Sequence, residues 1–384
     1  MALTRELVSL DSRNPSLVPG GPGEHAASVA LAAVLRDWGF RVAVQEAAPG
    51  RPNVIARIGG RGPSLMLNGH LDVVGVEGMT HAPFDAEIRD GRIYGRGSAD
   101  MKGGVAAMCA AAARASAAGG AGGELGGEVI IAAVADEEFE SIGTRSLIAS
   151  GIRASAAIVT EPTRLAIAPA HRGFAWIELI FHGRAAHGSR YDIGIDAIRH
   201  AGLLLVELDL LEEGELSCRT HPLLGHASLH ASTIAGGIGW STYPDRCVLT
   251  IERRMLPGEA DAQVLEEVSS ACDRVRSRRP ALQVEMKLSF SQRPSDVAIS
   301  APIVRALSGA ITAGGDLVRI EGLSAWTDAA LLNDAGIPAI CYGPGDISMA
   351  HAAEEWVPVA EIERATETLT RLIELWCSGT ASTV

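Results

Sequence analysis

The sequence predicts a two-domain α/β protein, in which a mainly parallel sheet with helices on both faces is interrupted by a smaller α+β domain with an antiparallel sheet. Short apolar runs alternate with helix-like stretches up to about residue 170, and strands of antiparallel character follow to about residue 293. The chain has 384 residues, of which 47% are hydrophobic, and this suffices for more than one compact core.

Four short apolar runs are predicted to be strands of the parallel sheet: 65–67, 129–134, 156–159 and 337–342. Polar residues follow each run, directly or after a short loop. Because ligands of open α/β sheets lie beyond the carboxyl ends of the strands, these polar residues are expected to converge. The Ala-rich stretch 105–121 is expected to be a buried helix rather than a membrane span, since Arg114 and Ser116 interrupt it.

The change in sequence character predicts an inserted domain at 173–293, with 1–172 and 294–384 forming the domain around it. Segments 170–173 and 291–294 are the expected hinges. Within the insert, the pattern predicts strands at 174–181 and 247–255 and helices at 195–211 and 260–276.

Charge and cysteine usage exclude several classes of protein. A net charge of -13 argues against a nucleic-acid partner, which requires clustered Lys and Arg. Residues 1–13 mix charged side chains with leucines and lack the apolar core of a secretory signal. The six cysteines form no CxxC pair, which is typical of reduced thiols. We therefore expect a cytoplasmic protein with neither a nucleic acid nor a membrane as its partner.

The first candidate motif, Asn68-Gly-His70-Leu-Asp72, follows the first predicted strand. On an extended backbone, side chains two residues apart project to the same side, so His70 can bind a metal while Asp72 orients its ring. Taken alone, a structural pair at a strand end is the better explanation of this motif.

Glycines flank Asp100 in the segment Gly95-Arg-Gly-Ser-Ala-Asp100-Met-Lys-Gly-Gly104, and glycine lets the backbone approach a ligand closely. A dinucleotide-binding loop is excluded, because its pattern needs glycine where Asp100 stands and a carboxylate would repel a pyrophosphate. A helix N-cap remains a reasonable local role for Asp100.

Three carboxylates, Asp136, Glu137 and Glu138, directly follow the second apolar run. At the end of a sheet such a cluster is unfavourable unless positive charge compensates it, and a metal supplies that charge. An acidic solvated loop explains this motif in isolation about equally well.

Glu161, in Thr160-Glu161-Pro162, and His351, after the last apolar run, are weak candidates individually. Their value lies in combination, because four separate strand ends each offer a ligand-type side chain. Two histidines and three carboxylates together suit a pair of divalent ions. Imidazole ligands disfavour Mg and Ca, and the absence of thiolate ligands removes any need for a structural zinc site.

In combination these residues resemble the co-catalytic metallo-aminoacylases, a family that includes acetylornithine deacetylase, succinyl-diaminopimelate desuccinylase and the carboxypeptidase G-type enzymes. The likeness covers nearly the whole chain and implies a zinc aminopeptidase-like catalytic domain with an inserted lid or dimerisation domain. The segments that carry it, in this order, are 69–74, 97–104, 136–138, 160–162, 186–189 and His351.

The resemblance implies two divalent metal ions, with zinc as the first candidate and cobalt or manganese as alternatives. Asp72 would be the carboxylate that orients a ligand. Glu137 would be the general base, which takes a proton from the metal-acidified water and returns it to the leaving amine. The implied ligands, with Asp100 bridging the two ions, are His70, Asp100, Glu138, Glu161 and His351.

The resemblance also assigns roles to the inserted domain and implies a homodimer that opens and closes. His187 of one subunit would stabilise the oxyanion formed in the other, although without the resemblance it is more simply a turn-stabilising histidine. Arg254 aligns with an arginine that binds the substrate carboxylate in relatives. A solvated strand charge competes with this role, and Arg253 is an alternative. Ser241 stands where relatives often carry Asn, which leaves the identity of the substrate open.

We therefore expect an amidohydrolase that removes an acyl group from a small N-acyl amino acid or amine, with acetylornithine as the first candidate substrate. Desuccinylation, dipeptide or carboxypeptidase cleavage and deformylation of an N-formyl amine share this chemistry and remain alternatives. A metal-binding homologue without catalysis would have lost Glu137 or a ligand, whereas the sequence retains all of them.

Overall fold

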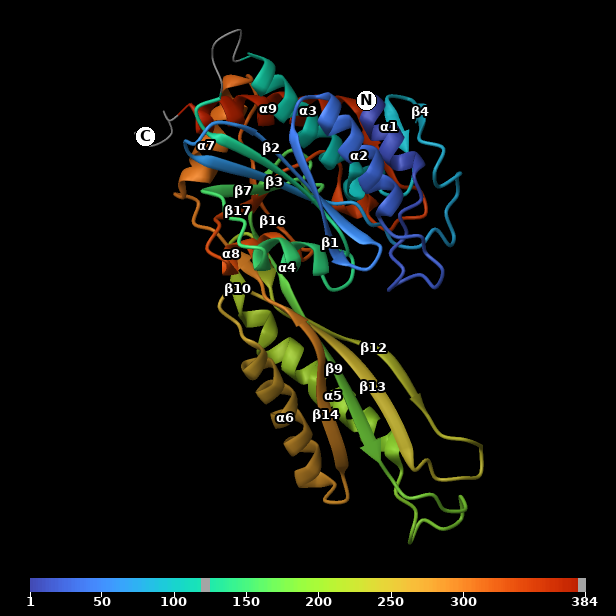
Figure 1. Ribbon diagram of the computed structural model, residues 1–384. Helices are drawn as coiled ribbons and strands as arrows, with labels where there is room; N and C mark the ends of the chain where they lie inside the picture. Colours follow the sequence, from blue (N-terminus) through green and yellow to red (C-terminus); the bar gives the residue numbers. More distant parts are fainter. Residues whose placement is uncertain (119–124, 379–384) are drawn as a thin grey trace. The chain divides into compact units, whose positions relative to one another are not determined.

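The computed structural model describes residues 1–118 and 125–378 (Figure 1). The chain divides into two compact units. The first unit comprises Met1–Pro169, Val297–Glu321 and Thr327–Val384, and the second comprises Ala170–Asp296 and Gly322–Trp326.

A nine-stranded sheet follows the path β1-β2-β6-β3-β7-β17-β8-β15, with β16 beside β8. Its central strands are parallel, as predicted: β6 (Glu128–Val134), β3 (Ser64–His70), β7 (Ala156–Val159) and β17 (Ala339–Cys341). Further strands that the sequence did not indicate extend the sheet on both sides of this centre: β1 (Arg41–Ala48), β2 (Arg51–Gly59), β8 (Ile167–His171), β15 (Ser295–Asp296) and β16 (Ile320–Leu323). The prediction of a mainly parallel sheet is therefore confirmed for its centre.

The strand register brings the carboxyl ends of the parallel strands to one edge. His70 pairs with Val134, Asn68 pairs with Val159, and Val159 pairs with Cys341. The segments that follow these strands consequently leave the sheet side by side. This topology brings together polar residues that are far apart in the sequence.

Helices cover both faces of the central strands (Figure 1). One face carries α1 (Ala2–Ser9), α2 (His25–Asp37), α3 (Gly103–Ala118), α7 (Pro302–Ala313) and α9 (Val359–Cys377), and the other carries α4 (Ile142–Ala149) and α8 (Ala329–Asp334). The Ala-rich helix α3 is mostly buried, as expected, and residues 119–121 of that prediction lie outside the described residues. None of the helices in the described part combines the length and apolar character that a membrane crossing requires.

Short elements complete the two units. A three-stranded sheet contains β18 (Trp356–Pro358), β5 (Arg92–Tyr94) and β4 (Glu87–Arg89). Single turns form η1 (Ser98–Lys102), η2 (Leu216–Cys218) and η3 (Ile347–Met349), and a short hairpin pairs β10 (Thr220–His221) with β11 (Gly225–His226).

The second unit is an antiparallel sheet with two helices on one face (Figure 1). Alternate side chains of the sheet, among them Ile177, Leu179 and Phe181, are buried in its core, which gives the two-residue period of a half-covered sheet. The sheet order is β12 (Ser228–Gly236), β13 (Arg246–Met255), β9 (Gly173–His182) and β14 (Gln283–Gln292), and the helices are α5 (Ala197–Gly214) and α6 (Asp261–Arg278).

A buried carboxylate links the two helices of this unit. Glu207 on α5 accepts a hydrogen bond from Arg274 at 2.7 Å and another from Arg278, both on α6. The hydrogen bond from Arg274 and the charges of both guanidinium groups lower the pKa of Glu207 below its usual value of 4.5.

We predict that Glu207→Gln lowers the unfolding temperature near neutral pH by about 2 °C, because the amide loses the charge that pairs with both arginines. The lowered pKa of Glu207 means that its charge stabilises the fold above its usual pKa of 4.5, and this stabilisation disappears as the pH falls through the folded-state value. Thermal unfolding across this range should therefore show a difference between wild type and variant that shrinks in acid. A difference that stays constant with pH would contradict the ion-pair role.

Candidate metal centre

The residues that follow the parallel strands meet at one edge of the central sheet in the first unit. Two groups of potential metal ligands overlap there, one formed by His70, Asp100 and Glu161 and the other by Asp100, Glu138 and His351. Within each group the ligand atoms lie within 4.8 Å of one another. The structure thus brings together the five residues that the sequence suggested, and Asp100 belongs to both groups.

Asp100 reaches this position through an irregular turn. It lies in η1 with φ -121° and ψ 93°, which are not helical values. Gly97 adopts a left-handed φ of 81°, and a Cβ atom on Gly104 would lie 2.0 Å from the carbonyl oxygen of Thr160. These glycines therefore allow the close backbone approach that brings Asp100 beside Glu161. Asp100 does not cap α3, which begins at Gly103.

Short distances join the side chains of the two groups to one another and to Glu137. Nε2 of His70 lies 3.0 Å from Oδ1 of Asp100 and 3.9 Å from Oε2 of Glu137. Nε2 of His351 lies 2.9 Å from Oε2 of Glu138 and 3.8 Å from Oδ2 of Asp100. The first group is buried, whereas the His351 side chain is 54% exposed.

Buried negative charge dominates the electrostatics of this site. Burial raises the pKa of Glu161 well above its usual range, and the charge of Asp100 raises it further. Burial and the charge of Glu161 also raise the pKa of Glu137 well above its usual range. Oε1 of Glu161 is buried and accepts no hydrogen bond from the described residues. A divalent cation would satisfy this oxygen and neutralise the cluster, and mixed imidazole and carboxylate donors suit zinc or a similar ion.

The imidazole ring of His70 is oriented so that its Nε2 atom faces the carboxylate cluster. Its Nδ1 donates a hydrogen bond at 2.9 Å to the backbone carbonyl of Asp72, which leaves Nε2 for a metal. The Asp72 carboxylate, which we expected to orient this ring, lies 3.7 Å from Nδ1. It accepts hydrogen bonds from the backbone N–H groups of Glu137 at 3.1 Å and Glu138 at 3.2 Å. Asp72 thus fixes the turn that presents both glutamates.

Sequence reasoning missed the residues that support this turn from the N-terminal segment. Nδ2 of Asn14 lies 2.9 Å from a carboxylate oxygen of Asp72 and 2.9 Å from one of Asp136. Arg51 donates to Asp136 at 3.1 Å and to Glu24 at 2.5 Å. No spacing pattern distinguishes these residues from ordinary polar side chains, because their burial depends on the complete fold.

Asp328 is a further buried carboxylate that the sequence did not reveal. It is 1% exposed and accepts a hydrogen bond at 2.6 Å from the hydroxyl of Thr144. Burial raises its pKa to about 6. Its only sequence signal is a Thr-Asp pair before a helix, and such pairs are common at helix starts.

His187 and Ser241 belong to the second unit, whereas the metal-ligand candidates belong to the first. His187 is exposed, and its Nδ1 lies 2.8 Å from the hydroxyl of Ser189. The backbone N–H of Gly188 donates to the carbonyl oxygen of Ser241 at 2.7 Å. His187, the histidine expected to act on the substrate, therefore lies close to Ser241 in the second unit.

The two candidate arginines of β13 have different surroundings. Arg253 is fully buried and forms ion pairs with Glu259 at 2.6 Å and with Glu267 at 3.2 Å. The Arg254 side chain is 32% exposed, binds Glu252 and lies over the ring of Phe174, 5.4 Å from its centroid. Only Arg254 of the pair thus has a guanidinium that solvent reaches.

Comparisons with known proteins place the chain in a family. Residues 66–375 match the model of Peptidase family M20/M25/M40. Acetylornithine deacetylase from Myxococcus xanthus is 29% identical, over 98% of this chain and 97% of its own. N-formyl-4-amino-5-aminomethyl-2-methylpyrimidine deformylase from Bacillus subtilis (strain 168) is also 29% identical, over 91% of this chain and 88% of its own.

A solved structure shares the fold. A dinuclear metal-binding peptidase of the M20 family from Bacillus subtilis superposes with a TM-score of 0.75 at 18% identity, covering 100% of this chain and 98% of its own. The chain belongs to peptidase family M20/M25/M40, and is thus a metal-dependent hydrolase that acts on amide bonds.

Proposed function

We propose that this protein removes the acyl group from a small N-acyl amino acid and uses two zinc ions as cofactors. The observation that carries the proposal is the pair of ligand groups that share Asp100. His70 and Glu161 would complete the first site, and Glu138 and His351 the second. One imidazole in each site favours zinc, cobalt or manganese over magnesium or calcium.

When bound, the two ions would polarise the scissile carbonyl and lower the pKa of the attacking water toward about 7. Glu137 is suited to be the base, because its carboxylate lies beside His70 yet belongs to neither ligand group. It takes the proton of the water and delivers it to the leaving amine. Glu138 instead contacts His351, so the two consecutive glutamates have different tasks.

We predict that Glu137→Ala lowers kcat by about 10²- to 10⁴-fold while the protein keeps about two metal ions, because it removes the base and no ligand. Glu138→Ala should lose metal as well as activity. Metal analysis after dialysis, combined with rate measurements, separates the two effects. Glu140→Ala is the matched control, since this glutamate lies in the same turn and is exposed. Equal metal loss in the Glu137 and Glu138 variants would contradict the division of roles.

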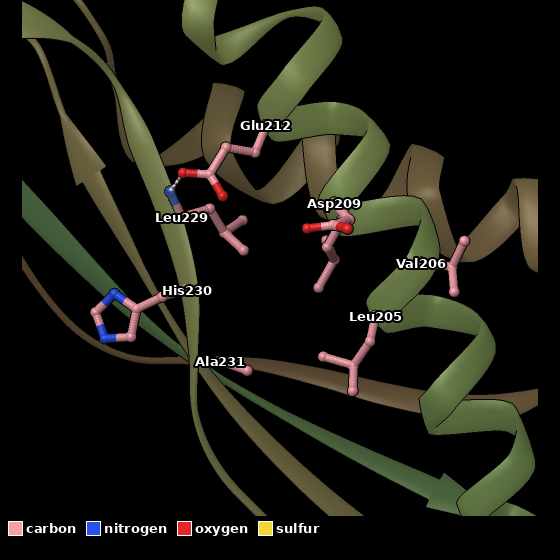
Figure 2. A pocket seen from close by; sticks show the side chains of 8 residues that line it. Leu205, Val206, Asp209, Glu212, Leu229, His230 and Ala231 are labelled. Carbon is pink, nitrogen blue, oxygen red and sulfur yellow. Dashed lines mark hydrogen bonds between the residues drawn. The ribbon is translucent and has the colours of Figure 1, made fainter.

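A homodimer is the second part of the proposal, and the second unit supports it. Strand β12 lies at the edge of its sheet, and most of its residues are exposed. Val206 and Leu210 on the adjacent helix α5 are each 56% exposed. Figure 2 shows the groove between α5 and β12, which has a volume of about 420 Å³. Its lining residues are Leu205, Val206, Leu208, Asp209, Glu212, Leu229, His230 and Ala231.

An unpaired sheet edge and exposed apolar side chains are typical of a protein interface. We propose that a second copy of the chain covers this surface. His187 would then serve the active site of the partner subunit and donate a hydrogen bond to the oxyanion.

Mixing two inactive variants tests this arrangement. Each site would combine Glu137 of one chain with His187 of its partner, so a heterodimer of Glu137→Ala and His187→Ala chains contains one intact site. We predict that each variant alone is nearly inactive and that a refolded equal mixture recovers about a quarter of wild-type activity. Failure to recover activity, once mixed dimers are demonstrated, would contradict a role in trans. Unaltered rates in His187→Ala would remove this residue from the site.

Arg254 is the proposed ligand of the substrate carboxylate, because Arg253 is occupied by Glu259 and Glu267 inside the second unit. N-acetyl amino acids are the first candidate substrates. Deformylation of an N-formyl amine is the second, since a deformylase matches the chain at the same 29% identity and Ser241 alters the surroundings of His187. A cytoplasmic location is also proposed, because all six cysteines are free thiols.

A substrate screen tests the proposed activity. Zinc- and cobalt-loaded protein is incubated with N-acetyl, N-succinyl and N-formyl compounds and with dipeptides, and the released amine is measured. We expect the fastest release from an N-acetyl amino acid. Faster release from another class would reassign the substrate. Release from none, with both metals bound, would favour a homologue that binds metal without catalysis.

A further inference from the structure

Glu355 is a fully buried carboxylate with no part in the mechanism above. Its Oε2 accepts a hydrogen bond from Nη1 of Arg96 at 2.7 Å. Its Oε1 accepts from the backbone N–H groups of Ala99 at 3.0 Å and of Asp100 at 3.2 Å. One side chain therefore holds the backbone of the residue shared by both ligand groups.

Arg96 is itself firmly held. Its side chain is 3% exposed, and its Nε donates to the carbonyl oxygen of Gly75 at 2.9 Å. Its backbone N–H donates to Pro83 at 2.8 Å, and the N–H of Gly95 donates to the carbonyl oxygen of Glu355 at 3.2 Å. Burying an ion pair requires desolvation of both charges, and apolar replacements are often at least as stable. A contribution to stability alone therefore explains this pair poorly.

The position of Glu355 in the chain suggests what it does. It follows His351 by four residues, so the same short segment carries a ligand candidate and the anchor of Asp100. His70 is the last residue of β3, and Glu161 follows the end of β7 by two residues, so both lie next to the central sheet. His351 instead lies in a loop after η3, with φ 61° and a half-exposed side chain. The second ligand group thus depends more on local anchors than the first.

We propose that Glu355, held by Arg96, is a positioning residue that fixes Asp100 relative to His351 and so sets the affinity for the second metal ion. This inference rests on the dinuclear centre proposed above. Without the acceptor at Oε1, two buried N–H groups lose their partner and the turn at Asp100 relaxes. His70 and Glu161, which lie next to the sheet, stay in place and still bind one ion.

Two conservative variants separate hydrogen bonding from charge. Glu355→Gln keeps an acceptor for the two N–H groups, but it has no charge, and its amide NH2 replaces the oxygen that accepts from Arg96. Glu355→Asp keeps the charge but is one methylene shorter. If Glu355 acted only through its charge, Glu355→Gln would bind the second metal ion more weakly than Glu355→Asp. If Glu355 is a positioning residue, Glu355→Asp binds this ion more weakly than Glu355→Gln.

The experiment is a zinc titration of metal-free protein against a chromophoric chelator, with cobalt absorption spectra as a second readout. Wild type is expected to bind two equivalents tightly. Glu355→Asp should bind the second at least about tenfold more weakly and keep the first, and Glu355→Gln should lose less affinity for the second ion than Glu355→Asp. Glu207→Ala is the control, because it removes another buried carboxylate bound by two arginines, in the second unit. It should be less stable yet bind both ions.

Unchanged binding of the second ion in Glu355→Asp would overturn the inference while leaving the proposed function intact. The inference is also overturned if Glu355→Gln binds the second ion more weakly than Glu355→Asp, or if Glu207→Ala loses as much affinity for this ion as Glu355→Asp. A wild type that binds fewer than two equivalents would instead overturn the dinuclear centre itself.

Discussion

The negative charge buried at the end of the parallel sheet must be compensated, and this requirement governs how the surrounding loops are built. Asp72, Asp100, Glu161 and Asp328 are all nearly inaccessible to solvent, and burial raises the pKa of three of them. A protein interior disfavours such charge unless cations or hydrogen-bond donors compensate it. The family to which the chain belongs hydrolyses amides with metal ions, and the same carboxylates that are unfavourable alone become ligands when cations are bound.

Donors from distant segments hold the loops that carry these carboxylates. On one side, Asn14 and Arg51 bind Asp136 and fix the turn that precedes Glu137. On the other, Arg96 and Glu355 bind the backbone at Asp100. The loops are irregular in backbone conformation, and these hydrogen bonds keep the geometry of the site outside regular secondary structure.

Much of the fold and of the ligand set could be predicted because the signals are local. An apolar run followed within three residues by His70 or Glu161 marks a strand end with a ligand-type side chain, and the family resemblance supplied the roles. Strand β1 was missed because charged residues and exposed positions obscure its alternation, and β12 because most of its residues are exposed. Glu355 stayed unassigned because it looks like a surface acid until the fold encloses it. Arg253 and Arg254 are indistinguishable in sequence, and only the structure shows which one is buried.

If two cations share Asp100, anomalous diffraction from crystals of the zinc-loaded protein will locate both of them. Data collected at the zinc absorption edge should show two peaks in the first unit, one between His70 and Glu161 and one between Glu138 and His351, with the Asp100 carboxylate between them. A single peak, or peaks that Asp100 does not contact, would contradict the shared site.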